Sequence, residues 1–195
     1  MWCDCVTARV PRVTRAFTTL AFSPSVRAAQ TRYGSRERMQ QAAAREPDRA
    51  VLSKEMQDRL RRADSVIIAT ASREGWPHIQ HRGGPPGFIK VLAPDELSFA
   101  DYSGNRQYIT VGNLAENERM MLRLLDYAAR TRLKVWGRGA VVDDDPALLE
   151  HVREPDYKAH VERVSRMRVE AAVDVAGVWR PKNLPIETLV RRAIM

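Results

Sequence analysis

A stretch rich in glycine and proline, with a cation on each side, is the most distinctive chemical feature of the sequence. It runs from Gln80 to Lys90 and reads Gln-His-Arg-Gly-Gly-Pro-Pro-Gly-Phe-Ile-Lys. Glycines let a backbone approach a ligand closely, and Arg82 and Lys90 can neutralise a phosphate through charge-assisted hydrogen bonds. The alternative is a bulged barrel strand whose glycines relieve crowding. The stretch is not a Walker loop, because the sequence has no Gly-Lys-Ser or Gly-Lys-Thr.

A second candidate site lies where an expected strand ends and an expected helix begins, between Phe99 and Gln107. A helix N-terminus with Arg106 beside it is a ready site for an anion. The alternative is that Ser103 or Asn105 is a plain helix cap and that Arg106 is solvated.

Other constellations are weaker. His78 and His81 are three residues apart on an expected strand, so they point to opposite faces and do not form a metal site. The acidic residues 143–145 precede Pro146 and fit the N-terminal charge of a helix. No Gly-x-Ser-x-Gly nucleophile elbow is present, and no catalytic residue is assigned. We expect no bound metal.

The elements that must position these side chains begin with helices. Residues 25–60 are rich in Ala, Arg, Gln and Glu, which predicts two or three helices. Ser53 is expected to cap a helix that runs to about Ala63.

From Asp64 onward the sequence consists of short runs of β-branched and apolar residues, which are separated by residues typical of turns. The order is helices, about six strands with a short helix (105–117) inserted midway, another helix (146–153) and a last strand. Short spacings between the strands imply a closed or nearly closed antiparallel barrel. The expected strands are 65–71, 76–80, 88–92, 97–101, 119–126, 132–142 and 167–175.

Length and charge limit the class of protein. The chain has 195 residues, enough for one well-buried core, and no apolar run long enough to span a bilayer, so no membrane association is expected. Its formal charge of +8 favours an anionic partner. Nucleic acid is disfavoured, because no helix-turn-helix or zinc-finger spacing occurs. A phosphorylated cofactor needs only a few placed cations.

The N-terminus adds little chemistry. Cys3 and Cys5 have no further cysteine with which to build a zinc site or a disulfide framework, and they are interpreted as reduced. Residues 1–15 lack a secretory signal and are interpreted as a disordered or over-extended tail. We expect a cytoplasmic protein with a helical lead-in at 16–63, one domain at 64–178 and a C-terminal tail at 179–195.

Several motifs in order resemble the pyridoxamine 5′-phosphate oxidase-related FMN-binding split-barrel family, over roughly residues 64–144. The motifs are Val66-Ile67-Ile68-Ala69-Thr70, Gly75-Trp76-Pro77, Gln80-His81-Arg82-Gly83-Gly84, Phe88-Ile89-Lys90, Gly104-Asn105-Arg106-Gln107, Asn113-Leu114-Ala115-Glu116-Asn117 and Lys134-Val135-Trp136-Gly137. The resemblance implies a mainly β fold with flanking helices, a six-stranded antiparallel split β-barrel. It also implies a homodimer with FMN at the interface.

The resemblance further implies that Lys90 and Arg106 hold the flavin phosphate. Gln107 stands where the oxidase proper usually has Lys, and Arg82 is the candidate to replace that cation. Asp101 matches a position that reaches the flavin.

Two more positions follow from the same resemblance. Arg132 falls near a position that contacts the isoalloxazine ring. Trp179, followed by Arg180, is the candidate to close over the cofactor, although the residues after it depart from the oxidase pattern and put pyridoxamine phosphate oxidation in doubt.

Three functions are consistent with the sequence. The first is an FMN-dependent oxidoreductase of the pyridoxamine 5′-phosphate oxidase-like type that acts on a small-molecule substrate. The second is a flavin-binding sensor or carrier without turnover, and the third, less favoured, is a basic nucleic-acid-binding protein. The sequence does not specify the substrate or the electron donor, and deazaflavin or haem can occupy related barrels.

Overall fold

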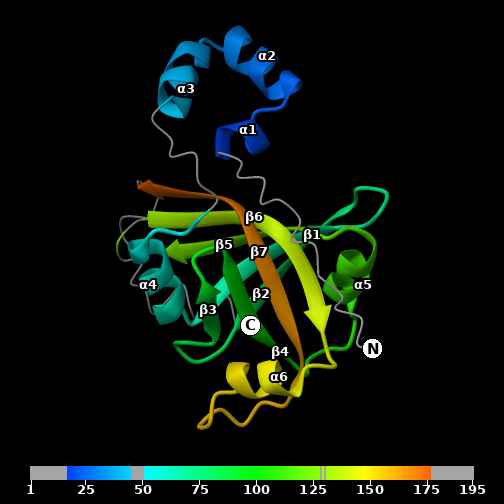
Figure 1. The fold of residues 1–195 in the computed structure, drawn as a ribbon. Helices are drawn as coiled ribbons and strands as arrows, with labels where there is room; N and C mark the ends of the chain where they lie inside the picture. The colour runs from blue at the N-terminus through cyan, green and yellow to red at the C-terminus, as the bar shows by residue number, and fades with distance from the viewer. Residues whose placement is uncertain (1–16, 45–50, 128, 130, 177–195) are drawn as a thin grey trace, which may run out of the picture.

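A seven-stranded antiparallel sheet forms the body of the protein (Figure 1). The computed structural model describes residues 17–44, 51–127, 129 and 131–176. Its strands are β1 (Ser65–Ala71), β2 (Pro77–Gly83), β3 (Ile89–Ala93), β4 (Glu96–Tyr102), β5 (Arg119–Asp126), β6 (Thr131–Val142) and β7 (Val161–Ala176).

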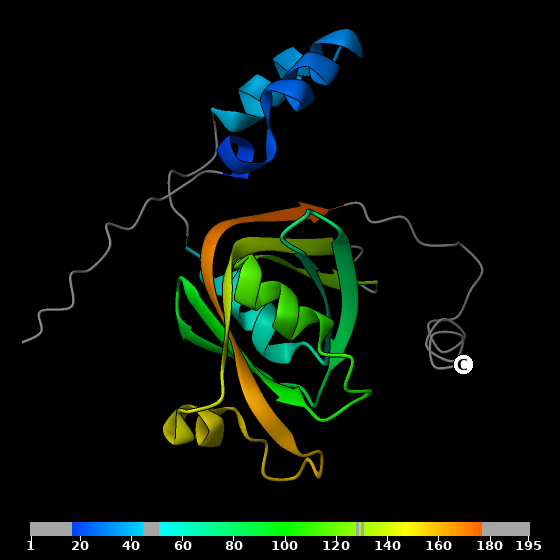
Figure 2. The same ribbon diagram turned by 90° about the vertical axis from the view of Figure 1, so that its right-hand side faces the viewer.

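The sheet curves into an open barrel with the strand order β2-β1-β5-β6-β7-β4-β3 (Figure 2). Mainly β structure with flanking helices is confirmed, but the sheet is open and contains seven strands, whereas the resemblance implied a barrel of six. The last expected strand is present as β7 in the same sheet, but it begins at Val161 rather than at residue 167 and is 16 residues long. It pairs with β6 on one side and β4 on the other, so β2 and β3 remain at the two edges.

The core fills the concave side of this sheet. Along β1 and β5, alternate residues such as Ile68 and Leu122 are buried, as expected for strands with one face toward a core. Phe88 and Phe99 are the largest fully buried side chains.

Six helices are present in the described residues: α1 (Phe17–Ala21), α2 (Pro24–Arg32), α3 (Arg36–Ala43), α4 (Lys54–Arg62), α5 (Ile109–Glu116) and α6 (Pro146–Val152). Figure 1 shows α1 to α3 on one side of the barrel, away from α6. No helix in the described part of the chain is long and apolar enough to cross a membrane.

The predicted cap at Ser53 is confirmed, because its hydroxyl accepts a hydrogen bond of 3.3 Å from the backbone N–H of Met56. We expect Ser53→Ala to lower the free energy of unfolding by about 1 kcal/mol, measured by chemical denaturation. Ser35 precedes α3 without such a side-chain bond, so Ser35→Ala is the matched control. Equal losses in the two variants would contradict the capping argument.

The helix after β4 starts later than predicted. It was expected from residue 105, but α5 begins at Ile109. Arg106 and Tyr108 have φ angles of 57° and 52°, in the left-handed region, so a right-handed helix cannot include them. The residues from Gly104 to Tyr108 therefore form a loop beside the end of β4.

The glycines of the 80–90 stretch allow the backbone conformation that connects β2 to β3. A Cβ at Gly84 would lie 2.7 Å from Cβ of Phe88, and Gly87 has a φ of +97°. Gly84 therefore lets the chain pass over a fully buried ring, as the crowding alternative predicted, and only Gly83 of these glycines lines the pocket described next.

Candidate functional site

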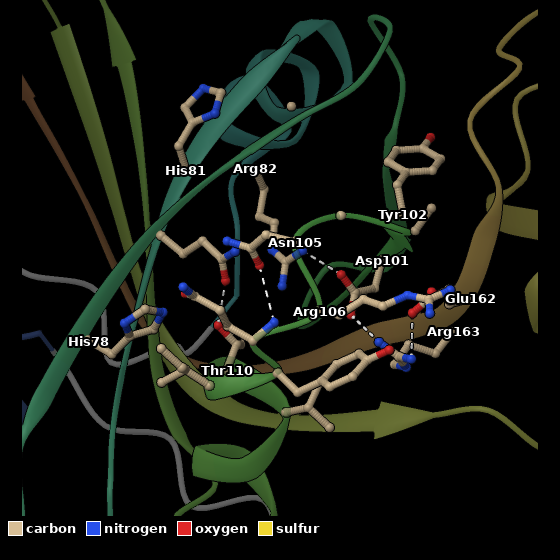
Figure 3. A pocket seen from close by; sticks show the side chains of 18 residues that line it. His78, His81, Arg82, Asp101, Tyr102, Asn105, Arg106, Thr110, Glu162 and Arg163 are labelled. Atoms are coloured by element: carbon tan, nitrogen blue, oxygen red, sulfur yellow. Dashed lines mark hydrogen bonds and ion pairs between the residues drawn. The ribbon is translucent and has the colours of Figure 1, made fainter. Parts of the chain in front are cut away.

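A pocket of about 290 Å³ opens between β2, the end of β4, the 104–108 loop and the start of β7 (Figure 3). Its polar wall contains three guanidinium groups, from Arg82, Arg106 and Arg163, and two carboxylates, from Asp101 and Glu162. Three guanidiniums against two carboxylates leave a net charge of +1 when histidines are not counted, so the pocket favours an anionic ligand.

Asp101 is the centre of this charge cluster and is only 3% exposed. Its carboxylate accepts hydrogen bonds from Arg82 and, at 3.2 Å, from Arg163. Arg163 lies directly opposite Asp101 in the β4–β7 register and also binds Glu162 at 2.6 Å. Burial alone would lower the pKa of Arg163, but hydrogen bonds to Asp101 and Tyr108, with the charges of Asp101 and Glu162, raise it overall.

Arg106 is the cation of the pocket that is left for a ligand. Its side chain has no ion pair or hydrogen bond to any residue that the structure describes, whereas Arg82 and Arg163 share Asp101. The left-handed backbone at Arg106 and Tyr108 carries a conformational cost, which is typical of functional loops. The Arg163 guanidinium lies 4.9 Å from the centre of the Tyr108 ring and supports this loop from β7.

Three buried polar atoms of residues that line the pocket have no partner among the described residues: Nε2 of His78, Nε of Arg82 and the hydroxyl of Tyr102. Burial raises the pKa of Tyr102, and the nearby Glu154 and Tyr157 raise it further, so the phenol stays protonated.

The helix α5 is fixed to this wall by its own polar side chains. Thr110 donates a hydrogen bond of 2.9 Å to Gln80 on β2, and Asn113 donates one of 3.0 Å to Thr70 on β1. The pocket is therefore held between the edge strand and the helix.

The structure brings together four of the seven residues predicted to bind the cofactor: Arg82, Asp101, Arg106 and Gln107 line the pocket. Lys90 is instead paired with Glu154, from the chain that follows α6. Arg132 lies on β6 and does not line the pocket.

The seventh, Trp179, lies outside the described residues. His78 and His81 both lie on β2, and the described residues contain no cluster of three His, Cys, Asp or Glu that could hold a metal ion.

Glu162 and Arg163 are charged pocket residues that the sequence did not indicate, because residues 161–166 were not included in the last expected strand. Residues 161–166 read Val-Glu-Arg-Val-Ser-Arg and show no alternation of apolar and polar residues, so no local signal could have extended the strand.

The fold agrees with what comparison of the whole sequence shows. The sequence model of the family described as pyridoxamine 5′-phosphate oxidase matches residues 52–180, and the chain belongs to this family.

Among solved structures, HupZ of Group A Streptococcus is similar, with 14% identity, a TM-score of 0.53, and 67% of this chain and 98% of that chain covered. A protein of Lactobacillus delbrueckii named as a candidate pyridoxamine 5′-phosphate oxidase is similar with 20% identity, a TM-score of 0.50, and coverage of 64% and 94%. At these identities the likeness shows the fold alone. A search of curated proteins gives no match.

Proposed function

We propose that the protein binds FMN at the Arg106 pocket and is an FMN-dependent oxidoreductase that acts on a small-molecule substrate. The observation that carries the proposal is that three guanidiniums line one pocket: two of them share a buried carboxylate, and Arg106 has no partner in the described residues. Membership of the pyridoxamine 5′-phosphate oxidase family supports a flavin rather than another anion.

The donor set of the pocket fits the phosphate end of this cofactor. Arg106 would donate charge-assisted hydrogen bonds to phosphate oxygens, and the charge of Arg82, which also lines the pocket, would favour the anion. Asp101 would keep Arg82 and Arg163 in place rather than touch the phosphate, because like charges repel. Gln107 would add a neutral donor where the oxidase proper usually has a cation.

When bound, the flavin supplies the redox chemistry, and the chain supplies binding, orientation and a shielded site. Few catalytic side chains are required for this division of labour.

A second copy of the chain would complete the site. A volume of about 290 Å³ lies at the lower end of the range for small-molecule sites, so one chain encloses only part of a cofactor and its substrate. The proposal therefore includes a homodimer with the flavin at the interface, with Trp179 closing over the ring. We place this homodimer in the cytoplasm.

The test is flavin retention. Purified protein is mixed with excess FMN and desalted, and the visible absorbance of the bound flavin is measured. Retention of about one FMN per chain is expected. Protein that emerges without FMN, while haem or a deazaflavin is retained, would contradict the proposal.

A flavin-binding protein without turnover is the second candidate. Both carboxylates of the pocket are engaged by arginines, so neither is a free general base. Reduction by nicotinamide donors and reoxidation would be followed by flavin absorbance. If the flavin is retained but no donor reduces it, the sensor or carrier function is favoured.

A further inference from the structure

The helices α2 and α3, residues 24–43, form an arm that extends away from the barrel on the side opposite α6 (Figure 1, Figure 2). Neither helix contains a buried residue. The arm is attached to the barrel through α1, where Thr18 is buried and the ring of Phe17 lies 5.1 Å from the ring of Trp136.

The two helices of the arm are too short to be stable without further contacts. They have nine and eight residues, and helices of fewer than about 12 residues are marginal in water unless they pack against another surface. Tyr33, which follows α2, is 76% exposed, and tyrosine is enriched where proteins contact each other. The arm therefore needs a second surface to cover it.

The charge of the arm limits what that surface can be. Residues 24–36 contain three arginines and no acidic residue. Arg27 donates a hydrogen bond of 2.9 Å to the backbone oxygen of Phe22, and Arg36 donates one of 2.8 Å to Gln30. Arg32 lies 5.5 Å from the centre of the Tyr33 ring. Because no carboxylate of the described residues pairs with these arginines, the complementary surface is acidic.

The protein has such a surface at the opposite end of the barrel, which we call the α6 surface (residues 143–158). It contains six acidic residues and two cations, a net charge of −4 with histidine neutral. Asp143, Asp144 and Asp156 are exposed and form no ion pair within the described residues. Tyr157, next to Asp156 in the sequence, is 42% exposed.

A single chain does not bring the two surfaces together, because they lie at opposite ends of the barrel (Figure 1, Figure 2). A two-fold axis can do so. A second copy placed antiparallel on the side of the arm has its own α6 end turned in the direction in which the arm extends. The same axis forms the contact twice in each dimer.

We propose that the arm of each copy packs on the α6 surface of the other copy, with the arginines of residues 24–36 facing the unpaired aspartates. The proposal builds on the homodimer of the proposed function and names the surfaces that hold it together. The ring of Tyr157 lies 5.0 Å from that of Tyr102, which lines the Arg106 pocket. The arm of one copy would therefore lie against a loop that supports the ligand pocket of the other.

The test uses two charge-reversed variants of the full chain, whose self-association is measured by sedimentation velocity without flavin. The arm variant carries Arg27→Glu and Arg36→Glu, both in the first turn of a helix, where a carboxylate is favourable. The α6 variant carries Asp144→Arg and Asp156→Arg. Each variant should raise the dissociation constant of the dimer by about tenfold or more, because exposed ion pairs are individually weak but the axis doubles each change.

An equimolar mixture of the two variants is the decisive measurement. In the mixed dimer, the acidic arm meets the basic α6 surface and the basic arm meets the acidic one. The mixture should therefore associate within about threefold of the unmodified affinity, although neither variant does so alone. Glu55→Arg reverses an exposed charge on α4 and should leave self-association unchanged. Circular dichroism checks that every variant keeps its fold.

Two results would overturn the proposal: unchanged self-association in both variants, or a mixture that associates no better than its components. A third would be binding of the unmodified protein to phosphatidylglycerol vesicles or single-stranded DNA that the arm variant loses while its dimer stays intact. FMN retention is measured separately. Rescue of the dimer without FMN retention supports the arm contact and contradicts the flavin, whereas FMN retention without rescue does the reverse.

Discussion

Replacing Asp101 by Asn is expected to lower the free energy of unfolding by about 3 kcal/mol. The substitution keeps the size of the side chain but removes the negative charge between Arg82 and Arg163, whose side chains are each only 17% exposed. Two poorly solvated guanidiniums would then lack their shared counter-ion. Urea denaturation at neutral pH, followed by circular dichroism, measures the loss.

The control for this variant is Asp58→Asn. Asp58 also pairs with two cations, Lys54 and Arg61, but on the surface of α4, where such pairs contribute little. We expect a much smaller loss there. If both variants lose the same stability, burial of Asp101 is not the cause, and the account of the pocket as a preformed charge cluster is wrong.

Arg106→Ala is expected to weaken FMN binding by about 10- to 100-fold while leaving riboflavin binding nearly unchanged. The physical reason is that a charge-assisted hydrogen bond to phosphate contributes about 1.5–3 kcal/mol, and riboflavin has no phosphate. Quenching of flavin fluorescence on titration with protein measures both affinities. Because Arg106 has no protein partner in the described residues, its removal should not destabilise the fold.

Two further variants sharpen this result. Gln107→Lys introduces beside Arg106 the cation that the oxidase proper usually has, and it should tighten FMN binding. Arg38→Ala removes an exposed arginine from α3 and should have no effect. Equal weakening of FMN and riboflavin in Arg106→Ala would place Arg106 at the ring or in the fold rather than at the phosphate.

The strands could be predicted because their signals are local. The β1–β2 hairpin follows from the β-branched run at 65–71 and a turn at Arg73 to Gly75, and the helix cap follows from Ser53. Strand β5 was ambiguous by periodicity and was resolved by its expected partner β6, with which it pairs over its whole length. The expected pairing with β6 therefore identified β5 as a strand, which the hydrophobic periodicity of β5 alone did not.

The rest depends on contacts between distant parts of the chain. Nothing near Lys90 in the sequence indicates that Glu154, 64 residues later, lies against it. Arg163 reaches the pocket because β7 pairs with β4, and this pairing is not encoded in residues 161–166 alone. The start of α5 was missed because left-handed backbone at Arg106 and Tyr108 is unusual for residues other than glycine.

The position of β7 between β6 and β4 also sets an order of assembly during synthesis. The β3–β4 hairpin joins the sheet only through β7, which is made about sixty residues later. Until then β4 has a free edge, and Asp101 is exposed on it without Arg163. Closing such a long loop is slow compared with forming hairpins. We therefore expect the pocket to be completed only when β7 has paired with β4, so a chain that ends before residue 161 would have the Arg106 loop but no finished pocket.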